Sequence, residues 1–174
     1  MWNSTGRLSC ENPNLQQVPR DPKLRSLVCA PPGYVFVEAD FSQIELRVAA
    51  MLSNDPVMKE LFITGQDIHA KTAELVSGRK LDEFEGFEKK EWRKKAKAVN
   101  FGFLYGMGAK KFQEYARDKY QVTFTIEEAK EIRKKFFASY PGLQPWHERQ
   151  RRIAEFNGYV RNLCGRVRHL PQIY

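Results

Sequence analysis

The chain has 174 residues, a length that suits one compact domain or two small subdomains. Its formal net charge of +8 and sequence pI of about 9.4 indicate an anionic partner. The three cysteines form no CxxC pair and no apolar run is long enough to cross a bilayer, so a zinc site, a disulfide framework and a membrane span are not supported.

The first predicted elements lead up to an acidic residue. Residues 1–33 are rich in Asn, Pro, Gln, Ser and Arg, and we expect loop with short extended pieces there. Residues 34–39 form a mostly apolar, β-prone run that predicts a buried strand ending at Asp40. A helix is predicted over residues 43–53.

Most of the remaining chain is predicted to be helical. Asp55-Pro56 places an acidic cap before a proline at the first helical position. Thr125 followed by Glu128 matches the capping box that opens a helix. The charged residues 79–91 are expected to cross the surface. The predicted helices run from Asp55 to near Gly65, from Asp67 to near Gly78, from Glu91 to Tyr105, from Lys110 to Tyr120, from Thr125 to Pro141 and from Leu143 to Phe156.

The C-terminal residues predict a β-hairpin, because residues 159–163 and 166–170 flank Cys164-Gly165. The fold class that follows is α+β and mostly helical.

Asp40 is the first candidate for chemistry. A carboxylate at a strand end suits a hard cation such as Mg²⁺, which takes oxygen ligands. Taken alone, Asp40 is better explained as the N-cap of the following helix. Gln43, Glu45 and Arg47 stand just beyond it, and as a set these residues are harder to explain as a cap.

The helix predicted from Glu91 carries a second candidate. Arg93, Lys97, Phe101 and Tyr105 are spaced four apart and therefore lie close to one stripe of the helix. The stripe begins cationic and becomes aromatic, which suits a triphosphate followed by a sugar or base. The alternative is an amphipathic core helix with solvated basic residues.

Three sets of residues resemble motifs of family A (DNA polymerase I-like) DNA polymerases. Residues 40–47 (Asp-Phe-Ser-Gln-Ile-Glu-Leu-Arg) resemble the first catalytic motif, and residues 93–106 match the spacing of the fingers motif. Asp67-Ile68-His69 resembles a string in which the family places a triphosphate-contacting histidine, although a lone histidine near a helix start is usually structural. The segments around Arg7 and Arg166 also match.

The resemblance implies roles for individual residues. Asp40 would bind two catalytic Mg²⁺ ions, with Mn²⁺ as an alternative ion, and Lys97 would donate a proton to the leaving pyrophosphate. Glu45 would be a steric gate at the sugar 2′ position, and Tyr105 would close against it. The residues implied to bind the nucleotide are Ser42, Gln43, Glu45, His69, Arg93, Lys97, Phe101 and Tyr105. Those implied to contact DNA are Arg7, Asn14, Gln16, Gly102 and Arg166; Asn14 and Gln16 alternatively order their loop.

The resemblance also implies the organisation of the chain and its partners. Residues 1–55 would be a palm segment, 56–157 a fingers subdomain with its nucleotide-binding helix at 91–106, and 158–174 a hairpin returning to the palm. The expected partners are primer–template DNA, dNTPs and the missing polymerase segments of a parent chain, with no membrane. The location would be cytoplasmic and nucleoid-associated, or the organellar or viral equivalent.

Both ends of the sequence suggest cuts through a larger protein, and the family's second catalytic motif, a His-Asp-Glu turn, has no counterpart because no His-Asp pair occurs. We therefore expect a DNA polymerase fragment that is inactive alone. The alternatives are a non-catalytic DNA- or nucleotide-binding fragment and a relative of single-subunit RNA polymerases, against which Glu45 argues.

Overall fold

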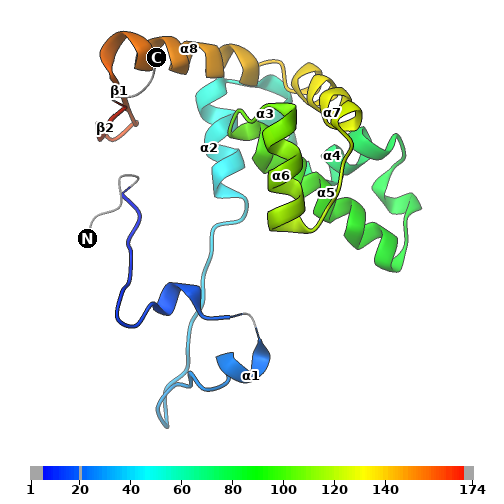
Figure 1. The fold of residues 1–174 in the computed structure, drawn as a ribbon. Coiled ribbons are helices and arrows are strands. Elements are labelled where there is room, and N and C mark those ends of the chain that lie inside the picture. The colour runs from blue at the N-terminus through cyan, green and yellow to red at the C-terminus, as the bar shows by residue number, and fades with distance from the viewer. Residues whose placement is uncertain (1–5, 20, 171–174) are drawn as a thin grey trace. The chain divides into compact units, whose positions relative to one another are not determined.

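The computed structural model describes residues 6–19 and 21–170. The predicted mostly helical character is confirmed, with one two-stranded sheet among these residues (Figure 1). The elements are η1 (Leu15–Gln17), α1 (Pro22–Arg25), α2 (Ile44–Ser53), α3 (Pro56–Ile63), α4 (Ile68–Ser77), η2 (Leu81–Glu83), α5 (Gly86–Leu104), α6 (Ala109–Tyr120), α7 (Ile126–Ser139), α8 (Leu143–Asn157), β1 (Tyr159–Arg161) and β2 (Val167–His169). No helix in the described part of the chain has the length and apolar character of a membrane span.

The chain divides into two compact units. The helical unit is Gln43–Arg152 and contains α2 to α7 with most of α8. The terminal unit combines Met1–Ser42 with Ile153–Tyr174 and contains the hairpin. In this division by compactness α2 groups with the later helices, because it packs on α3. The palm and fingers divisions expected after residues 55 and 157 stay predictions.

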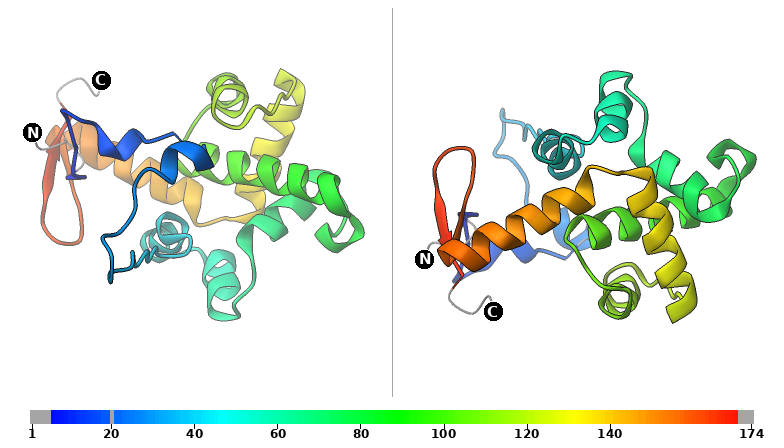
Figure 2. Two further views of the ribbon diagram at one scale, coloured as in Figure 1. Left: turned by 90° about the horizontal axis from the view of Figure 1, so that it is seen from below. Right: turned by 90° about the horizontal axis from the view of Figure 1, so that it is seen from above.

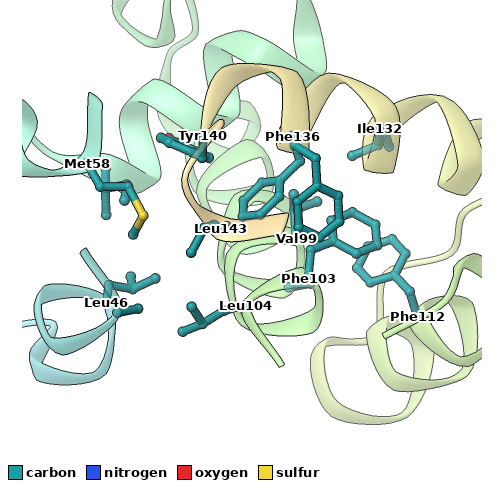
Figure 3. Close-up of a cluster of buried hydrophobic side chains, with 14 of the residues drawn as sticks. Leu46, Met58, Val99, Phe103, Leu104, Phe112, Ile132, Phe136, Tyr140 and Leu143 are labelled. Carbon is teal, nitrogen blue, oxygen red and sulfur yellow. The ribbon is translucent and has the colours of Figure 1, made fainter. Parts of the chain in front are cut away.

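Helix α5 lies between α4 and α6 in the helical unit (Figure 2). One face of α5 is anchored by a buried aromatic cluster, part of which Figure 3 shows. The ring of Phe103 lies 4.4 Å from that of Phe112 and 5.5 Å from that of Phe136, measured between centroids. Such pairs add to the stability gained from burial alone. Phe101 and Tyr105, two residues away on either side, therefore lie on the opposite face of the helix.

The helix ends follow local capping chemistry. The Asp67 side chain accepts hydrogen bonds from the backbone of His69 and Ala70, and α4 ends before Gly78, whose φ is +74°. The Thr125 hydroxyl accepts from the Glu128 backbone at 3.1 Å, while the Glu128 carboxylate accepts from the Thr125 backbone at 2.7 Å. The predicted helix boundaries at Asp67 and Gly78 and the predicted capping box at Thr125 are confirmed.

A fully buried aspartate connects two turns of the helical unit. Asp55 Oδ1 accepts a hydrogen bond from the Met58 backbone at 2.9 Å and caps α3, and its Oδ2 accepts from the Gly142 backbone at 2.6 Å. A Cβ on Gly142 would lie 2.7 Å from the Asp55 Cα. A glycine is therefore needed where the α7–α8 turn approaches the start of α3.

The predicted buried strand at residues 34–39 is wrong. This segment has no regular secondary structure, and Val35 and Val37 are 82% and 87% exposed. A strand forms only when a neighbouring strand satisfies its backbone donors and acceptors. No described residue pairs with this segment as a strand, so its β propensity is not realised.

Two other secondary-structure predictions differ from the structure. Helix α5 begins at Gly86 rather than at Glu91, because the intervening residues are mainly Lys and Glu, which favour helix. Within the described residues up to 33, a 3-10 turn and the short helix α1 stand in place of extended pieces.

The C-terminal hairpin is confirmed. Strands β1 and β2 are antiparallel, with Tyr159 opposite His169 and Arg161 opposite Val167. The turn is closed by hydrogen bonds from Gly165 N to Asn162 O and from Asn162 N to Arg166 O, each 3.0 Å.

Candidate functional site

The end of α5 fixes the position of Tyr105. The Gly106 backbone donates to Phe103 O at 3.0 Å and that of Met107 donates to Gly102 O at 3.1 Å, the pattern of a Schellman turn. The φ of +72° at Gly106 lies in the left-handed region, which glycine adopts without steric cost. The turn leaves Tyr105 as the C-cap of the helix with an exposed side chain.

The predicted stripe lies along α5. Arg93 and Phe101 are half-buried and Lys97 is exposed. The rings of Phe101 and Tyr105 stack with centroids 6.5 Å apart. Lys95 points elsewhere, since its Nζ lies 4.2 Å from the centre of the Trp92 ring.

Asp67 holds the guanidinium of Arg93. The two side chains form an ion pair between the N-terminus of α4 and the second turn of α5. Partial burial favours the protonated form of Asp67. Hydrogen bonds from the Arg93 side chain and the His69 backbone, with the positive charge of Arg93, outweigh it and lower the pKa of this carboxyl. Arg93 is thus oriented by a charged partner.

His69 lies beside this ion pair and is only 4% exposed. Its ring centroid is 6.0 Å from that of Phe101. Burial lowers the pKa of His69 to about 4; the Asp67 carboxylate opposes this shift, while the charges of Lys97 and Arg93 add to it. His69 is therefore neutral near pH 7 at the cationic end of the stripe.

The aromatic end of the stripe is joined to α2. The Tyr105 hydroxyl donates a hydrogen bond to Glu45 Oε2 at 2.6 Å, a distance typical of a charge-assisted bond. The contact expected between these two residues is present in the structure. It places the Glu45 carboxylate next to the ring of Tyr105, on the side of α5 that carries Phe101.

Gly102 is buried under α6. A Cβ at this position would lie 2.6 Å from the Phe112 ring, so helix packing alone requires glycine here. The expected contact between Gly102 and a template base stays a prediction.

The remaining predicted site residues belong to the terminal unit, except Gln43, which caps α2 in a left-handed conformation with φ +55°. Asp40 and Ser42 are exposed. Asn14 Oδ1 accepts from the Gln16 backbone at 3.1 Å and the Gln16 side chain donates to Leu8 O at 3.0 Å, so both residues order their loop. Arg7 and Arg166 are not buried. The structure thus brings together Glu45, His69, Arg93, Lys97, Phe101 and Tyr105 in the helical unit.

Among the described residues, no group of three or more His, Cys, Asp or Glu side chains is arranged to hold a metal ion. Asp40 offers one exposed carboxylate, the type of ligand that Mg²⁺ prefers.

Sequence reasoning missed four residues around His69. Asp67 was recognised as a helix start but not as the partner of Arg93. Thr72, Asn100 and Tyr140 are buried polar residues linked to His69 by hydrogen bonds. Asn100 was detectable in principle, because a polar amide between Val99 and Phe101 needs a buried partner.

Comparison with known proteins identifies the family of the chain. The family model "DNA polymerase family A" matches residues 1–174. DNA polymerase I of Aquifex aeolicus is 42% identical over 164 residues, which cover 93% of this chain and 28% of that protein. The thermostable DNA polymerase I of Thermus filiformis is 38% identical over 174 residues, covering 98% of this chain and 20% of that protein.

A solved structure is also similar. It is described as the POL domain of Pol1 from M. smegmatis in complex with DNA primer–template and dNTP, and it matches with a TM-score of 0.78 and 32% identity. The match covers 97% of this chain and 29% of that chain. This chain thus spans about a fifth to a quarter of the curated relatives named above. The sequence, the helical fold and the agreement with the family model over the whole length show that the chain belongs to DNA polymerase family A.

Proposed function

We propose that this chain is the nucleotide-binding segment of a DNA-directed DNA polymerase. The complete enzyme extends a DNA 3′-hydroxyl with dNTPs, in DNA replication or repair. The observation that carries the proposal is the single face of α5 on which Arg93 and Lys97 precede Phe101 and Tyr105, with His69 of α4 beside it. The primer–template and dNTP named for the similar M. smegmatis structure support it.

The cationic end of the stripe binds the triphosphate. Arg93 and Lys97 supply charge-assisted hydrogen bonds to phosphate oxygens, which are stronger than bonds between neutral groups. Lys97, the more exposed of the two, also donates a proton to the departing pyrophosphate. His69 contributes a neutral N–H donor beside them.

The aromatic end receives the sugar and the base. Phe101 stacks near the nascent base pair and Tyr105 guards the template-base pocket. The Glu45 carboxylate, fixed by the Tyr105 hydroxyl at 2.6 Å, blocks the space that a ribose 2′-hydroxyl needs. Closure of α5 on a matched dNTP completes the site.

In the terminal unit, Asp40 supplies one carboxylate ligand for Mg²⁺, or for Mn²⁺ in its place. A single carboxylate fits Mg²⁺ as one of several ligands, since this ion usually keeps waters and takes substrate phosphate oxygens. When bound, the ion stabilises the charge that develops on the reacting oxygens. The backbone at Ser42 and Gln43 borders the nucleotide.

The terminal unit also contributes to DNA binding. Arg7 reaches the minor groove at the primer end, where an arginine can check base-pair geometry without reading sequence. Arg166 contacts a phosphate. Asn14 and Gln16 hold their loop against the duplex, and the backbone at Gly102 borders the template base. In this scheme residues 1–55 and 158–174 belong to the palm and 56–157 to the fingers.

A second candidate function applies to the chain alone, namely binding of DNA or nucleotide without catalysis. Two features of the sequence favour it: the net charge of +8, and the lack of a His-Asp pair that would supply a second carboxylate. Two-metal phosphoryl transfer needs more than one bridging carboxylate. A relative of RNA polymerases is disfavoured by Glu45, whose position rejects ribonucleotides.

Nucleotide binding is tested with the chain itself and a fluorescent dNTP. We expect Lys97→Ala to weaken binding by about tenfold, the loss of one charge-assisted hydrogen bond. Lys95→Ala is the matched control, because it removes the same charge from the other side of the same helix turn. Equal losses in both variants would show that binding is only a response to net charge, and the proposed site would be refuted.

Catalysis is tested by primer extension with dNTPs and Mg²⁺. A complete polymerase containing this segment should extend the primer, and Asp40→Ala should abolish extension. The chain alone should not extend it. Extension by the chain that Asp40→Ala abolishes would refute the proposed dependence on a second carboxylate.

A further inference from the structure

A buried chain of hydrogen bonds leads from the end of α7 to the ring of His69. The Tyr140 hydroxyl lies 3.2 Å from Thr72 Oγ1, which donates to Asn100 Oδ1 at 2.9 Å. Asn100 Nδ2 lies 2.8 Å from His69 Nδ1. Tyr140 is 1% exposed, Thr72 and Asn100 are 0% exposed, and His69 is 4% exposed.

The bonding of Tyr140 indicates the direction of these hydrogen bonds. Thr72 is the one hydrogen-bond partner of the Tyr140 hydroxyl among the described residues, and a buried O–H that cannot donate costs more than an unused lone pair. Tyr140 therefore donates to Thr72, and the single Thr72 proton goes to Asn100 Oδ1. The amide nitrogen of Asn100 then faces His69 and donates to Nδ1.

This direction determines which tautomer His69 adopts. A ring nitrogen that accepts a hydrogen bond carries no proton, so the proton of the neutral ring is on Nε2. We propose that Asn100 and Thr72 are positioning residues that hold His69 as the Nε2–H tautomer, so that Nε2 always offers a donor to a triphosphate oxygen.

The phosphate part of this inference rests on the proposed nucleotide site. The low pKa of His69 is consistent with it, because a neutral ring has only one N–H and the tautomer decides where that donor is. Besides burial, the charged groups beside the ring, Asp67, Lys97 and Arg93, also shift the pKa of His69.

The tautomer is measured on the chain without nucleotide by ¹⁵N NMR of labelled histidine. The chain has three histidines, so the His69 signals are assigned by their loss in His69→Gln. We expect a protonated Nε2 and an unprotonated Nδ1 in the wild type. Thr72→Val removes the hydroxyl that donates to Asn100 Oδ1 and should give a mixture of tautomers. Tyr140→Phe leaves Asn100 as the partner to which Thr72 donates, so the Nε2–H tautomer should persist in that variant.

Two variants control for general perturbation. Tyr120→Phe removes a phenol hydroxyl from α6, outside this chain of hydrogen bonds, and should leave the tautomer unchanged. Thr72→Ser keeps the hydroxyl and should restore the wild-type signals even if Thr72→Val fails to fold. A predominantly Nδ1-protonated His69 in the wild type, or an unmixed tautomer in Thr72→Val, would overturn the inference.

The functional consequence is measured as binding of dATP. Thr72→Val should weaken binding by roughly two- to fivefold, because part of the population no longer offers the donor. Wild-type affinity in Thr72→Val, with weakened binding in Lys97→Ala, would overturn the positioning role and leave the proposed site standing. Unchanged affinity in Lys97→Ala would refute the proposed site, and the NMR result would still decide the tautomer.

Discussion

The carboxylate of Asp67 pairs with the guanidinium of Arg93, the residue that we propose binds triphosphate. Asp67→Asn should tighten dNTP binding by about threefold to fivefold, because it removes a competing carboxylate and a charge that repels phosphate. Asparagine is also a good N-cap, so α4 should keep its start. The measurement is a fluorescence titration with a labelled dNTP.

The control for this substitution is Asp82→Asn. Asp82 forms an exposed ion pair with Lys89 at 2.8 Å, earlier along α5. Its removal should leave the affinity unchanged. Weaker binding in Asp67→Asn than in the wild type would show that Asp67 orients Arg93 for the ligand rather than competing with it.

The hydrogen bond between Tyr105 and Glu45 predicts a graded loss of sugar selectivity. In a complete polymerase with this segment, Glu45→Ala should raise ribonucleotide incorporation by roughly tenfold or more, since it opens the space for a 2′-hydroxyl. Tyr105→Phe should raise it by only about fivefold, because Glu45 remains and loses one hydrogen bond. The ratio of kcat/KM values for rNTP and dNTP measures both effects. Unchanged ratios would show that Glu45 is not the steric gate.

The close approach of Gly142 to Asp55 predicts a loss of stability. Gly142→Ala should lower the free energy of unfolding by about 2 kcal/mol, because the new methyl group cannot fit against the Asp55 backbone. Gly108→Ser is the control: no atom lies within 4 Å of a Cβ there, and serine is a suitable N-cap for α6. Urea unfolding measures the free energy of unfolding of each variant relative to the wild type. An equal change in Gly142→Ala and Gly108→Ser would contradict the packing argument.

The low pKa of His69 predicts acid sensitivity. The folded pKa of about 4 lies below the ordinary value of 6.5, so between these values the unfolded chain binds a proton that the folded chain excludes. The contribution of neutral His69 to the free energy of unfolding is fully present above pH 6.5. It is lost as the pH falls toward 4, at up to about 1.4 kcal/mol per pH unit. His147, whose pKa burial also lowers, acts in the same direction.

Urea unfolding between pH 7 and pH 5 measures this dependence. His69→Gln should reduce the pH dependence of the free energy of unfolding to the share that His147 contributes. His169→Gln, at an exposed hairpin position, should leave the wild-type slope. An equal slope in the wild type and His69→Gln would show that folding does not lower the pKa of His69.

Local chemistry accounts for what the sequence predicted well. Caps such as Asp55, Asp67 and Thr125 act within three residues along the chain, so helix starts were predictable. The stripe on α5 was predictable for the same reason, because a spacing of four specifies one side of a helix.

Contacts between distant residues were not predictable. Arg93 is 26 residues from Asp67, and Asn100 is 31 residues from His69, and no local pattern specifies which partner a buried polar group finds. The strand expected at residues 34–39 failed for a related reason, since β structure depends on a second strand that the segment cannot encode.

The open segment around Val35 and Val37 affects how the chain behaves in solution. Tyr34, Val35, Phe36 and Val37 expose large apolar, β-prone side chains on a segment without regular secondary structure, a combination that promotes cross-chain β-pairing and aggregation. The net charge of +8 opposes such association through mutual repulsion. Added salt screens that repulsion, so colloidal stability should fall as ionic strength rises.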